Sequence, residues 1–248
     1  MTAIHDYYEQ LAPTYDQNRF GNSYGRYIDA MERAILCQWL AGVPAAEVID
    51  IGCGTGRLLN FAQTGVDVSD AMLQEAARKF ADRRLVRSQL PDLSELFEAD
   101  PSLPATRPAR QFQVATCFHV FMHLSPQVIA QSLQTLAALV RPGGSLIVDL
   151  PSLRRRSLRR IRASSTPWHA NTVATTALLQ EWAGPEWKVI ARRGILFLPI
   201  HRLPSRLRAA CQPLDTLLCN SPLADWASYH VYQLQRQPVT EGARHDLA

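Results

Sequence analysis

The sequence lacks the features that mark several specialised classes of protein. No apolar run approaches the roughly 20 residues that a membrane-spanning helix needs, and residues 1–10 are too polar for a secretory signal. The five cysteines include no C-x-x-C pair, which argues against both a disulfide framework and a zinc knuckle. We therefore expect a globular protein of the cytoplasm, and its 248 residues are enough for one large domain or one domain with a modest insertion.

Lysine is also scarce, because Lys79 and Lys188 are the only lysines among 26 basic residues. The basic residues are unevenly spread. Residues 1–150 hold 12 basic and 16 acidic side chains, whereas residues 151–248 hold 14 basic and 6 acidic ones. The base composition of a genome would explain the arginine excess, but a basic second half would also concentrate anionic partners.

Hydrophobic periodicity predicts strands and helices that alternate along the first 150 residues. Such alternation is typical of a parallel sheet with helices on both faces. The final strand alternates apolar and polar residues, which suits an antiparallel strand at the edge of the sheet. The expected strands are 47–51, 65–68, 85–86, 112–120, 145–150, 187–197 and 227–235, and the expected helices are 5–11, 24–40, 57–61, 72–80, 93–97, 126–140, 171–183 and 205–219.

The most informative segment is a glycine-rich loop after the first strand, with the sequence Asp50-Ile51-Gly52-Cys53-Gly54-Thr55-Gly56. Glycines at every second position let the backbone approach a ligand closely. A dinucleotide site instead has the spacing G-x-G-x-x-G and an acidic residue about 20 positions later. Here Asp67 follows Gly52 by 15 residues and ends the next strand, where a carboxylate can accept hydrogen bonds from both hydroxyls of a ribose. The pattern favours an adenosine ligand without phosphates.

At this point the sequence resembles the class I S-adenosylmethionine-dependent methyltransferases, and especially the small-molecule subgroup that includes the ubiquinone and menaquinone biosynthesis enzymes. The likeness covers residues 5–150, and the remainder only by the order of elements. It implies an α/β, Rossmann-like three-layer sandwich with a mainly parallel seven-stranded sheet and an antiparallel last strand. The matching segments are Tyr7-Tyr8 to Tyr15-Asp16, the glycine loop, Gly65-Val66-Asp67-Val68-Ser69 with Ala71-Met72-Leu73, residues 112–124, and Leu139-Val140-Arg141-Pro142-Gly143-Gly144.

The resemblance implies a role for each matching residue. Asp50 and the loop glycines would hold the methionine end of the cofactor, Asp67 would bind its ribose, and Phe118 and His119 would border its sulfonium. The remaining cofactor contacts would be Gly52, Cys53, Gly54 and Gly56 in the loop, Tyr15, Arg19 and Tyr7 on the N-terminal side, Val68 and Met72 beside the adenine, and Ser88 and Gln89, which replace a commoner acid at the adenine edge.

His119 and His123 stand four residues apart, and three interpretations of them are open. They could line the core or the cofactor site, act as a general base toward a substrate, or bind a metal. No acidic residue accompanies them in the H-E-x-x-H manner, so no metal site is expected. A base is needed for an alcohol acceptor, whereas an amine, a phenolate or a ring nitrogen needs none.

Six arginines lie within residues 153–162. Such a run is most often a solvated loop or helix face, but it could also bind an anionic substrate, a nucleic acid or a membrane surface. Few aromatic residues accompany it for base stacking, so a small phosphate- or carboxylate-bearing substrate is favoured over RNA. The resemblance implies a substrate lid over residues 151–172, with Trp168 and His169 as substrate contacts beside Tyr24, and a helical cap over residues 1–42 of a single methyltransferase domain.

We therefore predict an S-adenosylmethionine-dependent methyltransferase that produces S-adenosylhomocysteine and needs no metal. Its acceptor would be a small metabolite, with an anionic one favoured, and oxygen would be methylated rather than nitrogen. Three alternatives stay open: a nucleic-acid methyltransferase that uses the basic last third, a non-catalytic subunit that binds the cofactor or a partner protein, and a nicotinamide oxidoreductase, which the glycine spacing disfavours. The sequence identifies neither the acceptor nor the oligomeric state.

Overall fold

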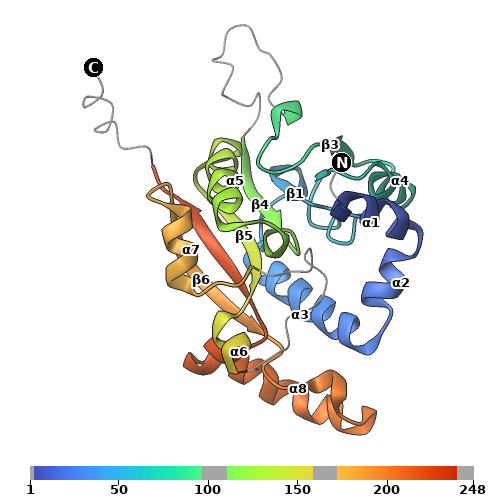
Figure 1. Ribbon diagram of the computed structural model, residues 1–248, viewed down its shortest axis with the longest axis vertical. Helices are drawn as coiled ribbons and strands as arrows, with labels where there is room; N and C mark the ends of the chain where they lie inside the picture. The colour runs from blue at the N-terminus through green and yellow to red at the C-terminus, as the bar shows by residue number, and fades with distance from the viewer. Residues whose placement is uncertain (1–2, 97–110, 159–171, 239–248) are drawn as a thin grey trace, which may run out of the picture.

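The computed structural model describes residues 3–96, 111–158 and 172–238, and a seven-stranded sheet runs through these residues (Figure 1). The strand order is β3-β2-β1-β4-β5-β7-β6, in which β1 to β5 are parallel and β7 is antiparallel to both of its neighbours. This confirms the expected sheet with an antiparallel last strand. The strands are β1 (Val48–Ile51), β2 (Thr64–Asp67), β3 (Arg84–Arg87), β4 (Phe112–Cys117), β5 (Val140–Pro151), β6 (Trp187–Ile195) and β7 (Tyr229–Arg236).

Helices cover both faces of the sheet and make the expected third layer. On one face, α5 (Pro126–Leu139) packs beside α7 (Thr176–Ala183), and both contribute to the larger apolar cluster. On the other face, α3 (Ser23–Trp39) and α4 (Asp70–Lys79) contribute to a second cluster. The other helices are α1 (Ala3–Leu11), α2 (Tyr15–Phe20), α6 (Leu153–Leu158) and α8 (Ser205–Cys219), and short 3₁₀ turns are η1 (Ala12–Thr14), η2 (Ala45–Glu47), η3 (Ser94–Leu96), η4 (Phe121–His123), η5 (Ile200–Arg202) and η6 (Pro222–Trp226).

Two helix starts follow directly from the sequence. Ser69 is the N-cap of α4, and its Oγ accepts a hydrogen bond from the Met72 N–H at 3.1 Å. Ser125 caps α5 in the same way, accepting from the Val128 N–H at 3.3 Å, and Pro126 occupies the first helical position, where its missing N–H costs nothing. Both helices therefore begin close to the predicted positions.

The predicted helix over residues 57–61 is wrong. These residues form successive turns instead, in which the Leu59 N–H bonds the Gly56 carbonyl and the Phe61 N–H bonds the Leu58 carbonyl. The nine residues between Gly56 and Val66 are too few for a regular crossover helix. Helix α3 contributes most of the helical cover of the second cluster, and the turn residues pack against it.

The predicted edge position of the last strand is also wrong, because β7 lies between β5 and β6 and β6 forms the edge. Val231 packs into one apolar cluster, whereas Tyr232 and Leu234 pack into the other, so both faces of β7 are covered. The prediction took the polar residues of β7 to be exposed, but some of them are buried and bonded within the protein. The buried His230, for example, makes a 2.8 Å contact from Nε2 to the Ala224 carbonyl.

The strand predicted to end at residue 120 ends at Cys117, and the helix predicted from residue 171 begins at Thr176. Helices α2 and α6 were not predicted. The early end of β4 matters for the site, because His119 then adopts a left-handed backbone conformation with φ of 61°, which is uncommon for a residue other than glycine.

The parallel strands end together at one edge of the sheet, and the chain order reverses there between β1 and β4. In open α/β sheets, ligands bind at such a reversal, beyond the carboxyl ends of the strands. None of the helices within the described residues is long and apolar enough to cross a membrane.

Candidate active site

The glycine loop follows β1 at this edge, and its backbone has conformations that favour glycine. Gly52, Gly54 and Gly56 all have positive φ, at 73°, 53° and 84°. A Cβ atom on Gly52 would lie 2.2 Å from the Val120 side chain, so the loop passes very close to the segment after β4. A Cβ atom on Gly54 would meet no atom of the described residues within 4 Å. At Gly54 the bare backbone therefore faces open space, as a ligand cradle requires.

Asp67, at the end of β2, holds this loop in place. Its Oδ2 accepts a hydrogen bond from the Gly54 N–H at 2.8 Å, and its Oδ1 accepts one from the Ser69 N–H at 2.9 Å. Burial raises the pKa of Asp67 above its usual value, although the backbone N–H groups oppose this effect. Each carboxylate oxygen has two lone pairs, so both retain capacity for a hydroxyl donor.

Asp50 lies deeper, at the end of β1. It is 2% exposed, and its Oδ1 accepts a hydrogen bond from Thr116 Oγ1 on β4 at 2.6 Å. Burial raises the pKa of Asp50 to about 6, while the Thr116 hydroxyl lowers it. Asp50 therefore changes charge within two pH units of neutrality.

A small hollow of about 30 Å³ lies between the glycine loop, the end of β4 and α2. It has room for one or two water molecules. Several predicted cofactor residues meet here, together with three residues that the sequence did not single out. The lining residues are Tyr15, Asp50, Gly52, Cys53, Gly54, Thr55, Arg57, Leu58, Phe118 and His119.

The other predicted cofactor residues lie outside this hollow. Gly56 packs against α4, Met72 is buried, and Val68 is half-buried after β2. Ser88 donates from Oγ to the Asp92 carbonyl at 3.0 Å, and Gln89 beside it is exposed. Arg19 is exposed on α2, and Tyr7 lies on α1. These residues stay predicted contacts.

Helix α1 lies beside α4, as Figure 1 shows, and so covers the predicted adenosine end of the site. Glu9 on α1 accepts a hydrogen bond from the Ala71 N–H in the first turn of α4 at 3.3 Å. Asp16 on α2 contacts both the glycine loop and α4: its Oδ1 accepts from Thr55 Oγ1 at 2.6 Å, and its Oδ2 pairs with Lys79. The N-terminal helices are therefore fastened directly over the predicted site.

Cys53 does not have the properties of a reactive thiol. It is 5% exposed, and burial together with the nearby Asp67 and Asp50 raises its pKa well above the usual value. A thiol with so high a pKa is not a nucleophile at neutral pH.

His119 belongs to a buried ionic cluster that sequence analysis missed. Its Nε2 lies 3.0 Å from Glu32 Oε1, and its Nδ1 lies 3.3 Å from Asp149 Oδ2. Its backbone N–H donates to Asp149 Oδ1 at 2.5 Å, and Arg57 pairs with Glu32 at 2.8 Å. Both carboxylates are 1% exposed. The sequence held a signal for each, since Glu32 stands on the apolar face of α3 and Asp149 stands within an apolar strand.

The cluster favours the protonated form of its histidine. Burial lowers the pKa of His119, but the charges of Glu32 and Asp149 outweigh burial and hold the pKa above its usual value. In the imidazolium form, each ring nitrogen faces a carboxylate oxygen at ion-pair distance. Its predicted use as a base would require one of these contacts to break.

The same three residues bring ligating atoms within 4.8 Å of one another, as a metal site would. Arg57, however, already supplies a cation to Glu32, and this favours an ion-pair cluster over a metal site. His123 lies apart, on η4, with its Nε2 3.2 Å from Tyr8 Oη. His119 and His123 thus face different surroundings despite their spacing in the sequence.

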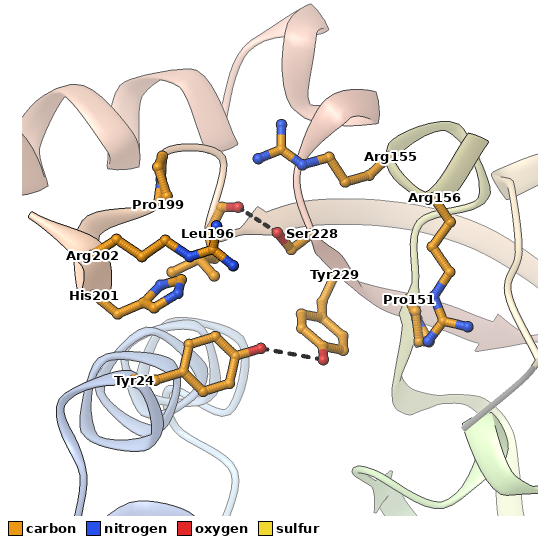
Figure 2. Close-up of a pocket in the computed structure, with 10 residues that line it drawn as sticks. All are labelled: Tyr24, Pro151, Arg155, Arg156, Leu196, Pro199, His201, Arg202, Ser228 and Tyr229. Atoms are coloured by element: carbon orange, nitrogen blue, oxygen red, sulfur yellow. Dashed lines mark hydrogen bonds between the residues drawn. The ribbon is translucent and has the colours of Figure 1, made fainter. Parts of the chain in front are cut away.

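A larger cavity of about 380 Å³ lies beyond the carboxyl end of β5 (Figure 2). Tyr24, a predicted substrate contact, is among its lining residues, whereas Trp168 and His169 lie outside the described residues. Two arginines of the basic cluster also line it. The lining residues are Tyr24, Pro151, Arg155, Arg156, Leu196, Pro199, His201, Arg202, Ser228 and Tyr229.

Comparison with known proteins finds similarity to methyltransferases over part of the chain. Residues 49–146 match the methyltransferase domain family. The chain is 35% identical over 107 residues to a ubiquinone biosynthesis O-methyltransferase of Azoarcus sp. (strain BH72), which is 42% of this chain and 44% of that protein. The chain spans about half the length of the curated relatives it matches.

Two solved structures share the fold over nearly the whole chain. Magnesium protoporphyrin IX methyltransferase from Synechocystis PCC 6803, with bound SAH, has a TM-score of 0.60 at 17% identity and covers 94% of this chain and 98% of its own. The [4+2]-cyclase SpnF also has a TM-score of 0.60, at 18% identity, and covers 96% of each chain. Because a cyclase shares the fold, the fold alone does not establish methyl transfer.

Proposed function

We propose, on the premise that residues 49–146 form a class I S-adenosylmethionine-dependent methyltransferase domain, that this protein methylates an oxygen atom of a small anionic metabolite. The observation that carries the proposal is the cradle formed by Gly54 and Asp67. The bare backbone of Gly54 faces open space, and the Asp67 carboxylate beside it retains lone pairs for the ribose hydroxyls.

The residues of the site suit this cofactor. Its sulfonium supplies a methyl group that is already activated for in-line displacement. The protein then has mainly to orient the reactants, and such positioning can contribute about 7–11 kcal/mol. Asp50 would bind the ammonium of the methionine end, while Tyr15 and Phe118, which line the hollow, would exclude water from the sulfonium.

Two observations favour a small anionic acceptor and oxygen as the atom methylated. The 380 Å³ cavity has the size of a small-molecule site and is lined by three arginines. A curated relative of the domain is named a ubiquinone biosynthesis O-methyltransferase. We carry over only the class of acceptor atom, because that match covers less than half of either chain.

If the acceptor is an alcohol, His123 suits the role of general base better than His119, because two carboxylates already engage the ring of His119. The test is the pH profile of methyl transfer in His123→Ala and in His119→Asn, which keeps a residue tolerant of a left-handed backbone. Loss of the acidic limb in His123→Ala alone supports His123. Unchanged profiles in both variants would exclude a histidine base.

The cofactor assignment is tested by calorimetry. The protein should bind S-adenosylmethionine and S-adenosylhomocysteine, and Asp67→Asn should weaken both by at least about tenfold. Asp70→Asn is the matched control, because Asp70 is exposed, pairs with Arg87 and lies three residues away. Absence of binding by the intact protein would overturn the proposal.

A screen of anionic phenols, sugars and heteroaromatics with labelled cofactor then identifies the acceptor. Two alternatives give different results in these assays. A cofactor-binding subunit would bind S-adenosylhomocysteine yet transfer no methyl group to any acceptor. A nucleic-acid methyltransferase would modify an oligonucleotide and lose that activity steeply as salt rises.

A further inference from the structure

The cavity of Figure 2 lies close to the predicted cofactor site. On β5, Asp149 contacts His119 of the ionic cluster, and Pro151, two residues later, lines the cavity. Two residues of a strand span about 7 Å. On α3, Glu32 contacts the same histidine, and Tyr24, about 12 Å away along the helix, lines the cavity. The cavity and the ionic cluster around His119 are therefore separated by only about 7 Å along β5 and about 12 Å along α3.

The charge of the cavity is one-sided. Arg155, Arg156 and Arg202 line it, and among the described residues that line it there is no aspartate or glutamate. Arg155 donates from Nη2 to the Phe197 carbonyl at 3.2 Å. Within the described part of the chain, neither the Arg156 nor the Arg202 guanidinium has a carboxylate partner. Such guanidinium groups are suited to binding a carboxylate or phosphate through two parallel hydrogen bonds.

The neighbouring Arg154, in contrast, forms an ion pair with a carboxylate. Its guanidinium lies 2.9 Å from Asp225 Oδ2, and Arg192 pairs with the same carboxylate. Asp225 is thus already shared by two arginines outside the cavity. The next two residues of α6, Arg155 and Arg156, both line the cavity (Figure 2).

Apart from the arginines, His201 and Ser228, the lining residues are apolar or aromatic. Pro151, Leu196 and Pro199 line the cavity together with the rings of two tyrosines. Tyr24 donates from Oη to Tyr229 Oη at 3.3 Å, and the edge of its ring meets His201 at a centroid distance of 4.7 Å. These contacts fix the two phenol rings, which together with the prolines suit a planar ring better than a flexible chain.

We propose that this cavity binds the methyl acceptor, and that the acceptor is a ring compound that carries a carboxylate or a phosphate. Arg156 and Arg202 hold the oxyanion, and Tyr24 and Tyr229 contact the ring. The identification of the ligand as an acceptor rests on the proposed function, whereas anion binding in this cavity does not.

The test is calorimetry of the full chain, saturated with S-adenosylhomocysteine, against three ring compounds: benzoate, phenyl phosphate and the neutral benzyl alcohol. At least one anion should bind, and benzyl alcohol should bind about tenfold more weakly or not at all. The relative affinities of benzoate and phenyl phosphate identify which oxyanion the cavity prefers.

Arg202→Gln and Arg156→Gln should each weaken anion binding by about tenfold or more. Arg206→Gln, an exposed arginine of α8 that does not line the cavity, should leave it within about twofold. Equal binding of the neutral compound, or binding that both cavity variants leave unchanged, would overturn the inference.

The methyltransferase function and the acceptor cavity can each be overturned without the other. Affinity for S-adenosylhomocysteine together with no affinity for either anion overturns the acceptor cavity alone. Anion binding that depends on Arg202, in a protein that does not bind S-adenosylhomocysteine, overturns the methyltransferase function and leaves an anion site. Competition by an oligonucleotide but by neither ring anion would overturn the small-molecule acceptor in favour of a nucleic acid.

Discussion

His119 Nε2 lies 3.0 Å from Oε1 of Glu32, a carboxylate that is almost completely buried. Burial alone would raise the pKa of Glu32, but the charges of His119 and Arg57 lower it below the usual value. The pair joins α3 to the segment after β4, and Asp149 joins the same histidine to β5. One ionic cluster thus connects the N-terminal helices with the centre of the sheet.

Replacing Glu32 with glutamine should lower the pKa of His119, because one of the two charges that stabilise the imidazolium is lost. NMR titration of the His119 ring measures this shift. The free energy of unfolding at neutral pH should fall by about 1–3 kcal/mol, the range for a buried polar group that loses its partner. Glu75→Gln, which disrupts an exposed pair with Arg78, is the control and should change neither quantity appreciably.

The raised pKa of His119 predicts that the protein loses stability as the pH rises. A histidine whose folded pKa is raised contributes stability that is fully present below its unfolded pKa, about 6.5, and is lost as the pH rises through the folded value. Urea unfolding across this range should show that loss in the wild type and a smaller one in Glu32→Gln. An identical pH dependence in both proteins would contradict the assignment.

Replacing Asp50 with asparagine should raise the stability of the protein but weaken its binding of the cofactor. The pKa of Asp50 is about 6 in the fold and 3.8 when unperturbed, so the folded state binds the proton more tightly. Stability therefore falls as the pH rises from about 4 to about 6, and the buried charge costs up to about 3 kcal/mol at neutral pH. Asparagine carries no charge and can still accept the Thr116 hydrogen bond.

We accordingly expect Asp50→Asn to be more stable than the wild type at pH 7 by about 1–3 kcal/mol, with weaker S-adenosylmethionine binding. Chemical denaturation and calorimetry measure the two effects. The wild-type affinity should also fall as the pH drops through about 6, and the variant should lack this dependence. A variant that is less stable yet binds normally would refute both expectations.

Gly54→Ala tests the cradle directly. The backbone at Gly54 has a positive φ, so alanine there costs about 1–2 kcal/mol in strain, but its methyl group meets no atom of the described residues within 4 Å. The methyl group would instead occupy the space assigned to the cofactor, and the affinity for S-adenosylhomocysteine should drop by at least about tenfold.

Gly42→Ala is the matched control, because Gly42 has φ of 79° and open space around a Cβ atom but lies after α3, away from the loop. Both variants should lose similar stability, and Gly54→Ala alone should lose affinity. Equal affinities in a thermal-shift or calorimetric assay would show that no ligand approaches the Gly54 backbone.

The sequence predicted the sheet and the glycine loop, but it did not predict the ionic cluster around His119. Glycine spacing and the position of Asp67 are local patterns, so their arrangement follows from the strand before and the strand after. The cluster around His119 depends instead on residues far apart in sequence, since Glu32 is 87 positions from His119. A lone acid on an apolar helix face was the available signal. The partner it meets is determined by tertiary packing.

The large cavity was beyond sequence reasoning for the same reason. Arg155 and Arg156 belong to a visible arginine run, but Arg154 beside them forms an ion pair away from the cavity. Composition does not distinguish these arginines. The direction of each side chain on α6 decides which of them faces a ligand, and the cavity walls come from β5, β7 and residues near η5.

Asp16 should control how quickly the cofactor enters. The hollow of about 30 Å³ is far smaller than an adenosyl ligand, and Tyr15 of α2 lines it, so we expect α2 to move when one binds. Asp16 fastens α2 through Thr55 and Lys79, and the Lys79 pair is partly exposed, hence worth about 0.2–1 kcal/mol. Asp16→Asn should therefore raise the association rate constant for S-adenosylhomocysteine about two- to fivefold, as measured by surface plasmon resonance.

High salt should accelerate association in the wild type and have little effect in Asp16→Asn, because salt screens the same pair. Asp82→Asn, which removes an exposed pair with Arg83 away from α2, is the control and should leave the rate unchanged. Association rates that neither salt nor Asp16→Asn alters would mean that the N-terminal helices do not gate the site, and that the cofactor reaches the glycine loop by another route.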